Sequence, residues 1–199
     1  MKRFLLLSLI LLFISCDFFE KDPRWIDTSN DTSIKIDTAI GKFKFGWFYD
    51  DFKDYLDRQV RIGIYEKDTD YYFEITNDGC DDLDFLKPLP IRIGNPKYTH
   101  QRISTYNYFV IDDIFFNPED NEPEWTVIKL WLTCLYGPNH YDWCENKKEG
   151  RLFLRKGNVL VEARRFNELL ITISITDLSL NPNAIQVLSK FCPKKPKRH

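Results

Sequence analysis

The chain has 199 residues, of which 43% are hydrophobic and 16% aromatic, and its 28 basic residues nearly balance its 30 acidic ones. This hydrophobic content excludes a largely disordered chain, and the length suits a single domain with a sizeable core. A formal charge of −2 provides no basic field for nucleic acid, so we expect no nucleic-acid partner. The basic residues 193–199 are expected to form a solvated tail.

A leader occupies the start of the chain. Two basic residues precede an apolar stretch over residues 4–15, which has the length of a signal-peptide core and is too short to cross a membrane. The sequence LFISC at residues 12–16 resembles the lipobox of bacterial lipoproteins, with Phe13 in place of the usual Leu. This resemblance implies cleavage before Cys16 and lipidation of its sulfur. The alternative is an ordinary secretory signal, although bulky Phe13 would then occupy a position that favours small residues.

The lipoprotein resemblance also implies a location and a membrane partner. Acyl chains on Cys16 would anchor the protein to the cell membrane or outer membrane, on the extracytoplasmic side, because two or more chains give stable attachment. The predicted organisation is a signal peptide over residues 1–15, the lipidated cysteine and a flexible tether over residues 16–33, a single β-rich domain over residues 34–192, and the basic tail over residues 193–199.

The first predicted elements of the domain are extended structure, a helix and a series of short strands. Residues 34–48 alternate in the manner of extended structure, and residues 50–58 predict a short helix, because Phe52, Tyr55 and Leu56 fall on one helical face. Apolar alternation between turn signals then predicts strands over residues 60–66, 71–76, 89–93, 98–104 and 106–111.

The strongest strand is predicted over residues 125–136, where both faces are apolar, as in a central strand. Gly157 and Asn158 predict a tight hairpin turn in the segment that follows. The strands expected around and after this turn cover residues 151–155, 159–165 and 169–176.

A C-terminal helix is predicted near residues 182–190, because Asn181 suits the N-cap and Pro182 suits the first helical position. Strands and helices do not alternate regularly along the chain. The predicted fold is therefore mainly β, an antiparallel sandwich or barrel-like sheet with a short helix near residues 50–58 and this C-terminal helix.

Four cysteines follow Cys16, and their even number suits two disulfides in an oxidising compartment. Three pairings are possible. We expect a local bridge between Cys134 and Cys144, which leaves Cys80 to pair with Cys192. Free buried thiols are the alternative. A zinc site is disfavoured because the chain has no C-x-x-C pair, and we expect no metal and no cofactor.

The sequence contains none of the nucleophile-elbow, zinc-protease, P-loop or dinucleotide motifs. His140 and Cys144 could form a nucleophilic pair, but a disulfide at Cys144 would remove the thiol. An acidic cluster could bind calcium, but its spacing departs from the EF-hand order and is more typical of an exposed loop. The members of this cluster are Asp78, Asp81, Asp82 and Asp84. We therefore assign no catalytic residue.

Aromatic residues at or near predicted loops are the candidates for a binding surface, because exposed rings anchor protein interfaces or stack on sugars. These candidates are Trp47, Trp125, Tyr141 and Trp143. The resulting hypothesis is a membrane-anchored, non-enzymatic module that binds an envelope or extracellular protein, in assembly, in immunity or inhibition, or in host contact. The alternatives are a glycan-binding lipoprotein and an envelope hydrolase that uses a carboxylate pair.

Overall fold

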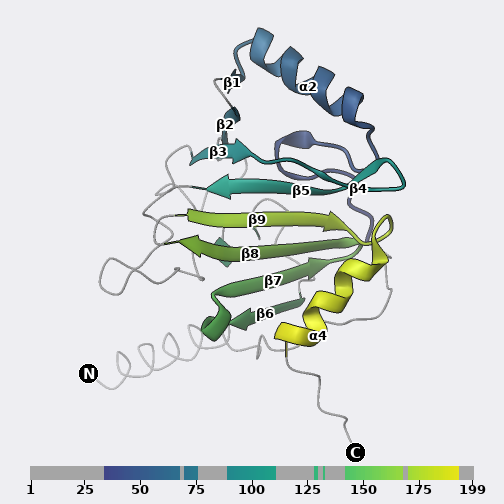
Figure 1. Ribbon diagram of the computed structural model, residues 1–199, viewed down its shortest axis with the longest axis vertical. Coiled ribbons are helices and arrows are strands. Elements are labelled where there is room, and N and C mark those ends of the chain that lie inside the picture. The colour runs from purple at the N-terminus through teal and green to yellow at the C-terminus, as the bar shows by residue number, and fades with distance from the viewer. Residues whose placement is uncertain are drawn as a thin grey trace, which may run out of the picture.

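The computed structural model describes residues 34–67, 70–75, 89–110, 128–129, 132, 142–167 and 170–192. Its strands form one nine-stranded antiparallel sheet in the order β1-β2-β3-β5-β9-β8-β7-β6, with β4 paired to β5 (Figure 1). The strands are β1 Tyr65–Lys67, β2 Tyr71–Ile75, β3 Leu89–Ile93, β4 Lys97–Thr99, β5 Arg102–Val110, β6 Asp142–Asn146, β7 Arg151–Lys156, β8 Val159–Asn167 and β9 Leu170–Asp177. The predicted mainly β, antiparallel fold is confirmed.

Both predicted helices are present. Helix α2 covers Tyr49–Arg61 and lies beside the β1 end of the sheet, three residues longer at its C-terminal end than the sequence pattern indicated (Figure 1). The C-terminal helix is divided into a 3-10 segment, η5 Pro182–Val187, and the short α4 Leu188–Phe191, with Pro182 at the first position as predicted.

The strand predicted over residues 125–136 is wrong where the structure describes it. Ile128, Lys129 and Leu132 are helical, and Ile128 and Leu132 are both buried in the main core. These two residues are four positions apart, so one helical face carries both into the core, while the Lys129 ammonium lies 2.8 Å from a carboxylate oxygen of Glu145. A short run of apolar residues does not discriminate a strand from a buried helix, which explains the error.

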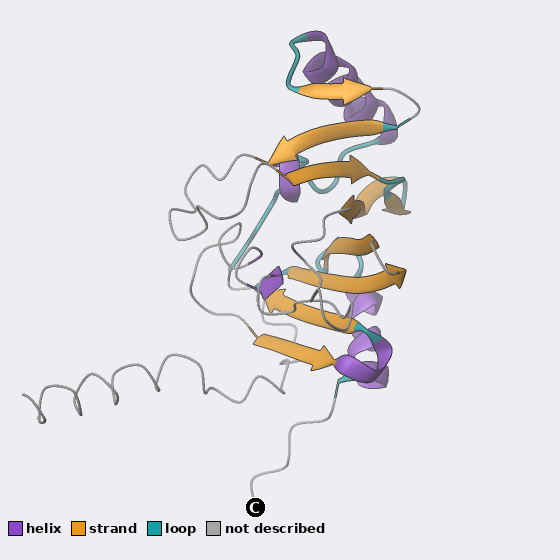
Figure 2. Cartoon of the chain, turned by 90° about the vertical axis from the view of Figure 1, so that its left-hand side faces the viewer, coloured by secondary structure: helices purple, strands orange, loops and turns teal. Residues whose placement is uncertain are grey.

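Strand alternation gives the sheet two different faces. One face carries the main hydrophobic core, to which β5, β7, β8 and β9 contribute inward side chains such as Tyr108, Leu154, Val161 and Ile173. On the opposite face, a smaller apolar cluster forms where η5 and α4 cover β6, β7 and β8 (Figures 1 and 2). Its central member is the fully buried Phe153.

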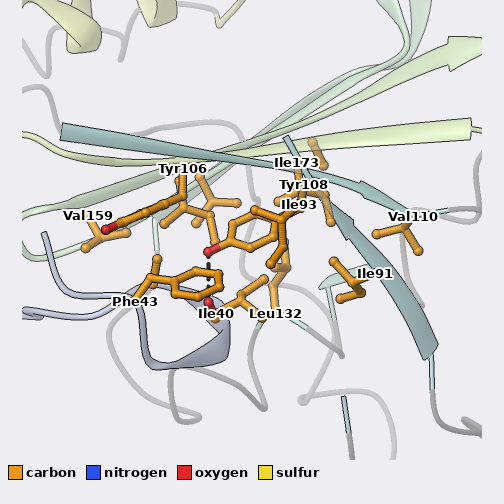
Figure 3. Close-up of a cluster of buried hydrophobic side chains, with 14 of the residues drawn as sticks. Ile40, Phe43, Ile91, Ile93, Tyr106, Tyr108, Val110, Leu132, Val159 and Ile173 are labelled. Carbon is orange, nitrogen blue, oxygen red and sulfur yellow. Dashed lines mark hydrogen bonds between the residues drawn. The ribbon is translucent and has the colours of Figure 1, made fainter. Parts of the chain in front are cut away.

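The core face is crossed by the N-terminal strap, which we define as residues 34–47. The strap contains the 3-10 turn η1 Ile40–Lys42, in place of the continuous extended structure that was predicted. It inserts the fully buried ring of Phe43 between α2 and β5, with centroids 5.3 Å from the rings of Phe52 and Tyr106 (Figure 3). The strap is therefore part of the core.

Four tyrosine hydroxyls hold the strap backbone. The hydroxyls of Tyr55 and Tyr65 both donate to the carbonyl of Gly41 at 3.1 Å. From β5, Tyr106 donates to Lys44 O at 2.7 Å, and Tyr108 donates to Ile40 O at 2.8 Å (Figure 3). These carbonyls and hydroxyls lose contact with water when the strap packs on the sheet. Each bond gives such a group a hydrogen-bond partner within the protein. The high aromatic content thus serves both packing and polar pairing.

The strap begins at the turn between β7 and β8. The Asn158 side chain accepts from Ile36 N at 2.6 Å and donates to Ile36 O and to Asp177 Oδ1, both at 2.9 Å. Its backbone N–H donates to Ile34 O at 3.2 Å. A Cβ on Gly157 would lie 1.9 Å from Ile34 O, so the close approach of the strap requires glycine there. We call this arrangement the Asn158 clamp.

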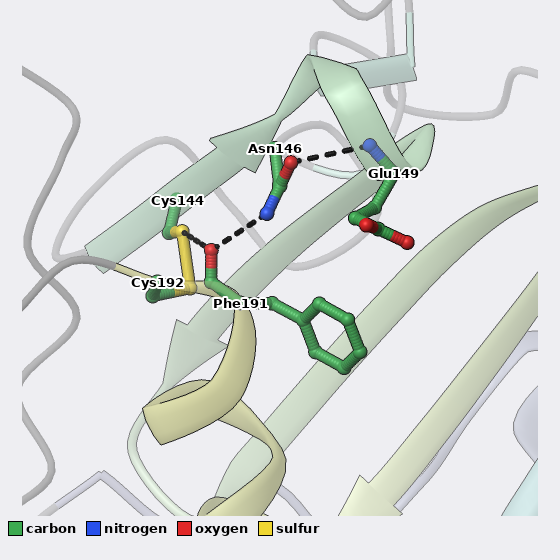
Figure 4. The surroundings of a disulfide bond; sticks show 5 residues. All are labelled: Cys144, Asn146, Glu149, Phe191 and Cys192. Atoms are coloured by element: carbon green, nitrogen blue, oxygen red, sulfur yellow. Dashed lines mark hydrogen bonds between the residues drawn. A yellow bond between two sulfur atoms is a disulfide. The ribbon is translucent and has the colours of Figure 1, made fainter.

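One disulfide joins Cys144 in β6 to Cys192 after α4, with the two Cα atoms 5.9 Å apart (Figure 4). The predicted partners, Cys134 for Cys144 and Cys80 for Cys192, are therefore wrong. The local bridge was favoured by chain proximity, but α4 folds back onto β6, where Asn146 Nδ2 donates to Phe191 O at 3.0 Å. Cys80 and Cys134 lie outside the described residues.

No helix within the described ranges has the length and apolar character needed to span a bilayer.

The Asn158 clamp predicts that Asn158→Ala lowers the free energy of unfolding by about 2–4 kcal/mol, because the N–H and C=O of Ile36 lose their partners. Urea denaturation of the oxidised protein would measure this loss. The matched control is Asn183→Ala on the exposed side of η5, which should change stability by less than about 0.5 kcal/mol. Equal effects of the two substitutions would contradict the clamp.

Candidate functional site

Exposed aromatic rings gather where the start of α2 meets the turn between β4 and β5. Phe48, Tyr49 and Tyr98 are 43%, 54% and 42% exposed, and the rings of Tyr49 and Tyr98 lie 6.5 Å apart between centroids. The guanidinium carbon of Arg102 lies 3.9 Å from the centroid of the Phe48 ring. We call these four residues the hairpin patch.

Local structure places each member of the hairpin patch. Phe48 immediately precedes α2, and its backbone N–H donates to the Asp51 carboxylate at 3.2 Å, as in half of a capping box. Arg102 begins β5, and its Nη1 donates to Gly46 O at 3.0 Å, which joins the hairpin to the strap. Phe48 and Arg102 are therefore held by these hydrogen bonds as well as by their own contact, and Tyr49 and Tyr98 are placed by the start of α2 and by β4.

The turn that presents Tyr98 and Arg102 has an unfavourable sequence for its shape. Thr99 pairs with Arg102, so His100 and Gln101 form a two-residue connection, and both have positive φ, 49° and 65°. Type I′ hairpin turns need positive φ at both positions and favour Asn-Gly for that reason. Left-handed backbone costs a residue with a side chain roughly 1–2 kcal/mol. Strain retained at an exposed tip is typical of functional sites.

The electrostatics of the hairpin patch are simple. Partial burial raises the pKa of the Tyr98 hydroxyl above its ordinary value, and the neighbouring Tyr49 adds to this shift. Tyr98 therefore stays neutral at physiological pH, and the positive charge of the patch comes from Arg102. An aromatic surface with hydroxyl groups and one guanidinium suits a protein partner, because tyrosine and arginine dominate the binding energy of protein interfaces.

The aromatic residues that the sequence suggested for a binding surface have different environments in the structure. Trp47 is half-buried and packs on Tyr55, with ring centroids 5.1 Å apart, so it supports the core beside the hairpin patch. Trp143 lies in β6, paired with Leu154. Trp125 and Tyr141 lie outside the described residues.

The candidates for chemistry give no site in the described chain. Cys144 is in a disulfide, so its thiol is not available to pair with His140, which lies outside the described residues. The acidic residues Asp78, Asp81, Asp82 and Asp84 also lie outside them. Among the residues that are described, no three His, Cys, Asp or Glu side chains come together in a group that could hold a metal ion.

Sequence reasoning missed the hairpin patch because its turn is hidden. Residues 98–104 were predicted as one strand, since neither His100 nor Gln101 is a usual turn residue. The available signal was the pair of aromatic residues at 48 and 49, at the start of a helix with an acidic first turn.

Comparison with known proteins finds no matching family model, no matching curated protein and no matching solved structure.

The strained turn predicts that the double substitution His100→Asn and Gln101→Gly stabilises the protein by about 1 kcal/mol, because Asn-Gly adopts positive φ at lower cost. Thermal and urea denaturation would measure the gain. The control is Gln186→Gly in η5, where φ is not positive, and there glycine should cost roughly 0.5–1 kcal/mol. A loss of stability in the double variant would show that the turn is not strained.

Proposed function

We propose that this protein is a lipid-anchored, non-enzymatic binding module of the bacterial cell envelope, and that the hairpin patch contacts a protein partner. The observation that carries the proposal is the exposed cluster of aromatic rings and arginine on a strained turn. Envelope assembly, immunity or inhibition, and host contact are the roles that fit such a module.

The anchoring part of the proposal is supported by the leader and by the cysteines. The sequence LFISC resembles a lipobox, with Cys16 as the lipidated residue. The disulfide between Cys144 and Cys192 suits an oxidising compartment outside the cytoplasm. The Asn158 clamp fixes the start of the strap to the domain. The segment between Cys16 and the strap would therefore link the membrane anchor to the domain at the Asn158 clamp.

The binding part is supported by the rigidity of the hairpin patch. Tyrosine offers a large contact area for little loss of side-chain freedom, and a preorganised surface loses less entropy on binding. Arg102 is already held by the Phe48 ring and by Gly46 O. The patch therefore needs little rearrangement to accept a partner.

The test is a crosslinked pull-down of the tagged protein, expressed with its own leader, compared with the variant Tyr49→Ala/Tyr98→Ala. We expect one dominant envelope or extracellular protein, with recovery reduced at least tenfold in the variant, because truncating a central interface tyrosine costs about 1–2 kcal/mol. Phe166→Ala removes a ring of β8 that is 65% exposed, more than either tyrosine, and serves as the matched control.

Unchanged recovery with Tyr49→Ala/Tyr98→Ala, or equal loss with Phe166→Ala, would contradict a role for the hairpin patch. Capture of glycan without protein would favour the glycan-binding alternative. Cys16→Ser tests the anchor separately: it should release the protein from the membrane fraction, and binding by the purified variant should persist.

A further inference from the structure

A hollow of about 340 Å³ is lined by residues of β3, β4 and β5 and of the turn that joins β3 to β4. Three charged residues line it, Asp70, Arg92 and Lys97, together with Gly94 and the ring of Phe109. Arg92, Asn107 and Phe109 alternate with core residues along their strands, so they belong to the sheet face opposite the strap. The hollow therefore opens on the face opposite the strap, and Ile93 of the main core contributes to its lining.

Arg92 is oriented without using its full donor capacity. Its guanidinium carbon lies 4.7 Å from the centroid of the Phe109 ring, and its Nε lies 3.4 Å from Asp70 Oδ2. This Nε is buried and has no hydrogen-bond partner of good geometry among the described residues. A guanidinium held in this way presents its terminal N–H groups as a fork for a bidentate anion.

Gly94 and the Phe109 ring lie in close contact in the wall of the hollow. A Cβ at position 94 would lie 2.6 Å from Cε2 of Phe109, so the ring can lie there only because the residue is glycine. Gly94 N–H donates to Asn107 O at 2.8 Å, and the Asn107 side chain donates to Asn95 O at 2.7 Å and accepts from the Ser174 hydroxyl at 2.8 Å. These bonds fix the loop and the ring that orients Arg92.

The charge of the hollow selects the type of ligand. Arg92 and Lys97 are positive and Asp70 is negative, which leaves about one net positive charge in a chain whose net charge is −2. None of the ion pairs among the described residues involves Lys97. One net positive charge matches a monoanionic carboxylate better than a dianionic phosphate, because Asp70 repels a dianion about twice as strongly as a monoanion at the same distance.

We propose that this hollow binds a small hydroxylated carboxylic acid, of the size and class of a sugar acid. Its carboxylate would pair with the terminal nitrogens of Arg92 and with Lys97, and Asp70 and the Asn95 amide would accept from its hydroxyl groups. The volume lies at the lower end of the range for small-molecule pockets. This site is independent of the hairpin patch and of its protein partner.

Isothermal titration of the purified full-length protein with sodium glucuronate tests the proposal. We expect saturable binding that weakens at least tenfold in Lys97→Met, because the substitution removes one of the two cations that pair with the carboxylate. Lys97 is exposed and Lys97→Met preserves its length, so folding should be retained. Lys190→Met, an exposed lysine on α4, is the charge-matched control and should bind as the unsubstituted protein does.

Two neutral or differently charged probes complete the experiment. Methyl glucoside, which lacks the carboxylate, and glucose 6-phosphate, which is a dianion, should each bind at least tenfold more weakly than glucuronate. Absence of saturable heat with glucuronate, unchanged affinity in Lys97→Met, or equal binding of either comparison probe would overturn the proposal. The pull-down through the hairpin patch does not depend on any of these results.

Discussion

The packing of the N-terminal strap on the core face of the sheet is the constraint on which the described structure depends. Phe43 fills the space between α2 and β5, and four tyrosine hydroxyls pair with carbonyls of the strap. Burial raises the pKa of Tyr65 and Tyr106 well above the ordinary tyrosine value, so both remain neutral donors. Their contribution to stability is present below about pH 10 and is lost as the pH rises further, because unfolded tyrosines ionise there.

The strap also determines which aromatic residues are exposed at one end of the sheet. The end at which β5 begins and β9 finishes holds the Asn158 clamp and the β4–β5 turn (Figure 1). The strap leaves the clamp, crosses the core and returns to this end, where Gly46 N–H donates to Ile103 O at 2.8 Å. Phe48 and Tyr49 follow directly, so the path of the strap brings them beside Tyr98 and Arg102. The core and the proposed binding surface therefore share one segment of chain.

The sequence was sufficient for the parts of the fold that depend on local pattern. Alternation and turn residues predicted strands close to β7, β8 and β9, and the turn at Gly157 and Asn158 is where it was expected. The helical segment at Ile128 and Leu132 was missed because a short buried helix and a short buried strand can both have a continuous run of apolar residues. The pairing of Cys144 with Cys192 depends on α4 folding back over β6, which is a tertiary contact without a local signal.

The functional site was harder to predict for a physical reason. Tryptophans near predicted loops were the natural candidates, yet Trp47 packs inward while its neighbours Phe48 and Tyr49 are exposed. Which of three consecutive aromatic residues faces solvent is decided by the start of α2 and by the pairing of Trp47 O with Ile103 N–H. His100 and Gln101 are not residues that favour turns. A prediction based on turn propensity therefore does not find this strained turn.

The strap is an integral part of the core, and native-state amide hydrogen exchange is the experiment that would show this. The amides of Ala39 and Phe45 donate within the strap, and that of Ile103 donates from β5 to the strap. We expect the strap amides to open with free energies within about 1 kcal/mol of those of the β5 and β9 amides, because strap and sheet unfold as one unit. Exchange of the strap amides at the rate of a solvated loop, with the sheet still protected, would contradict it.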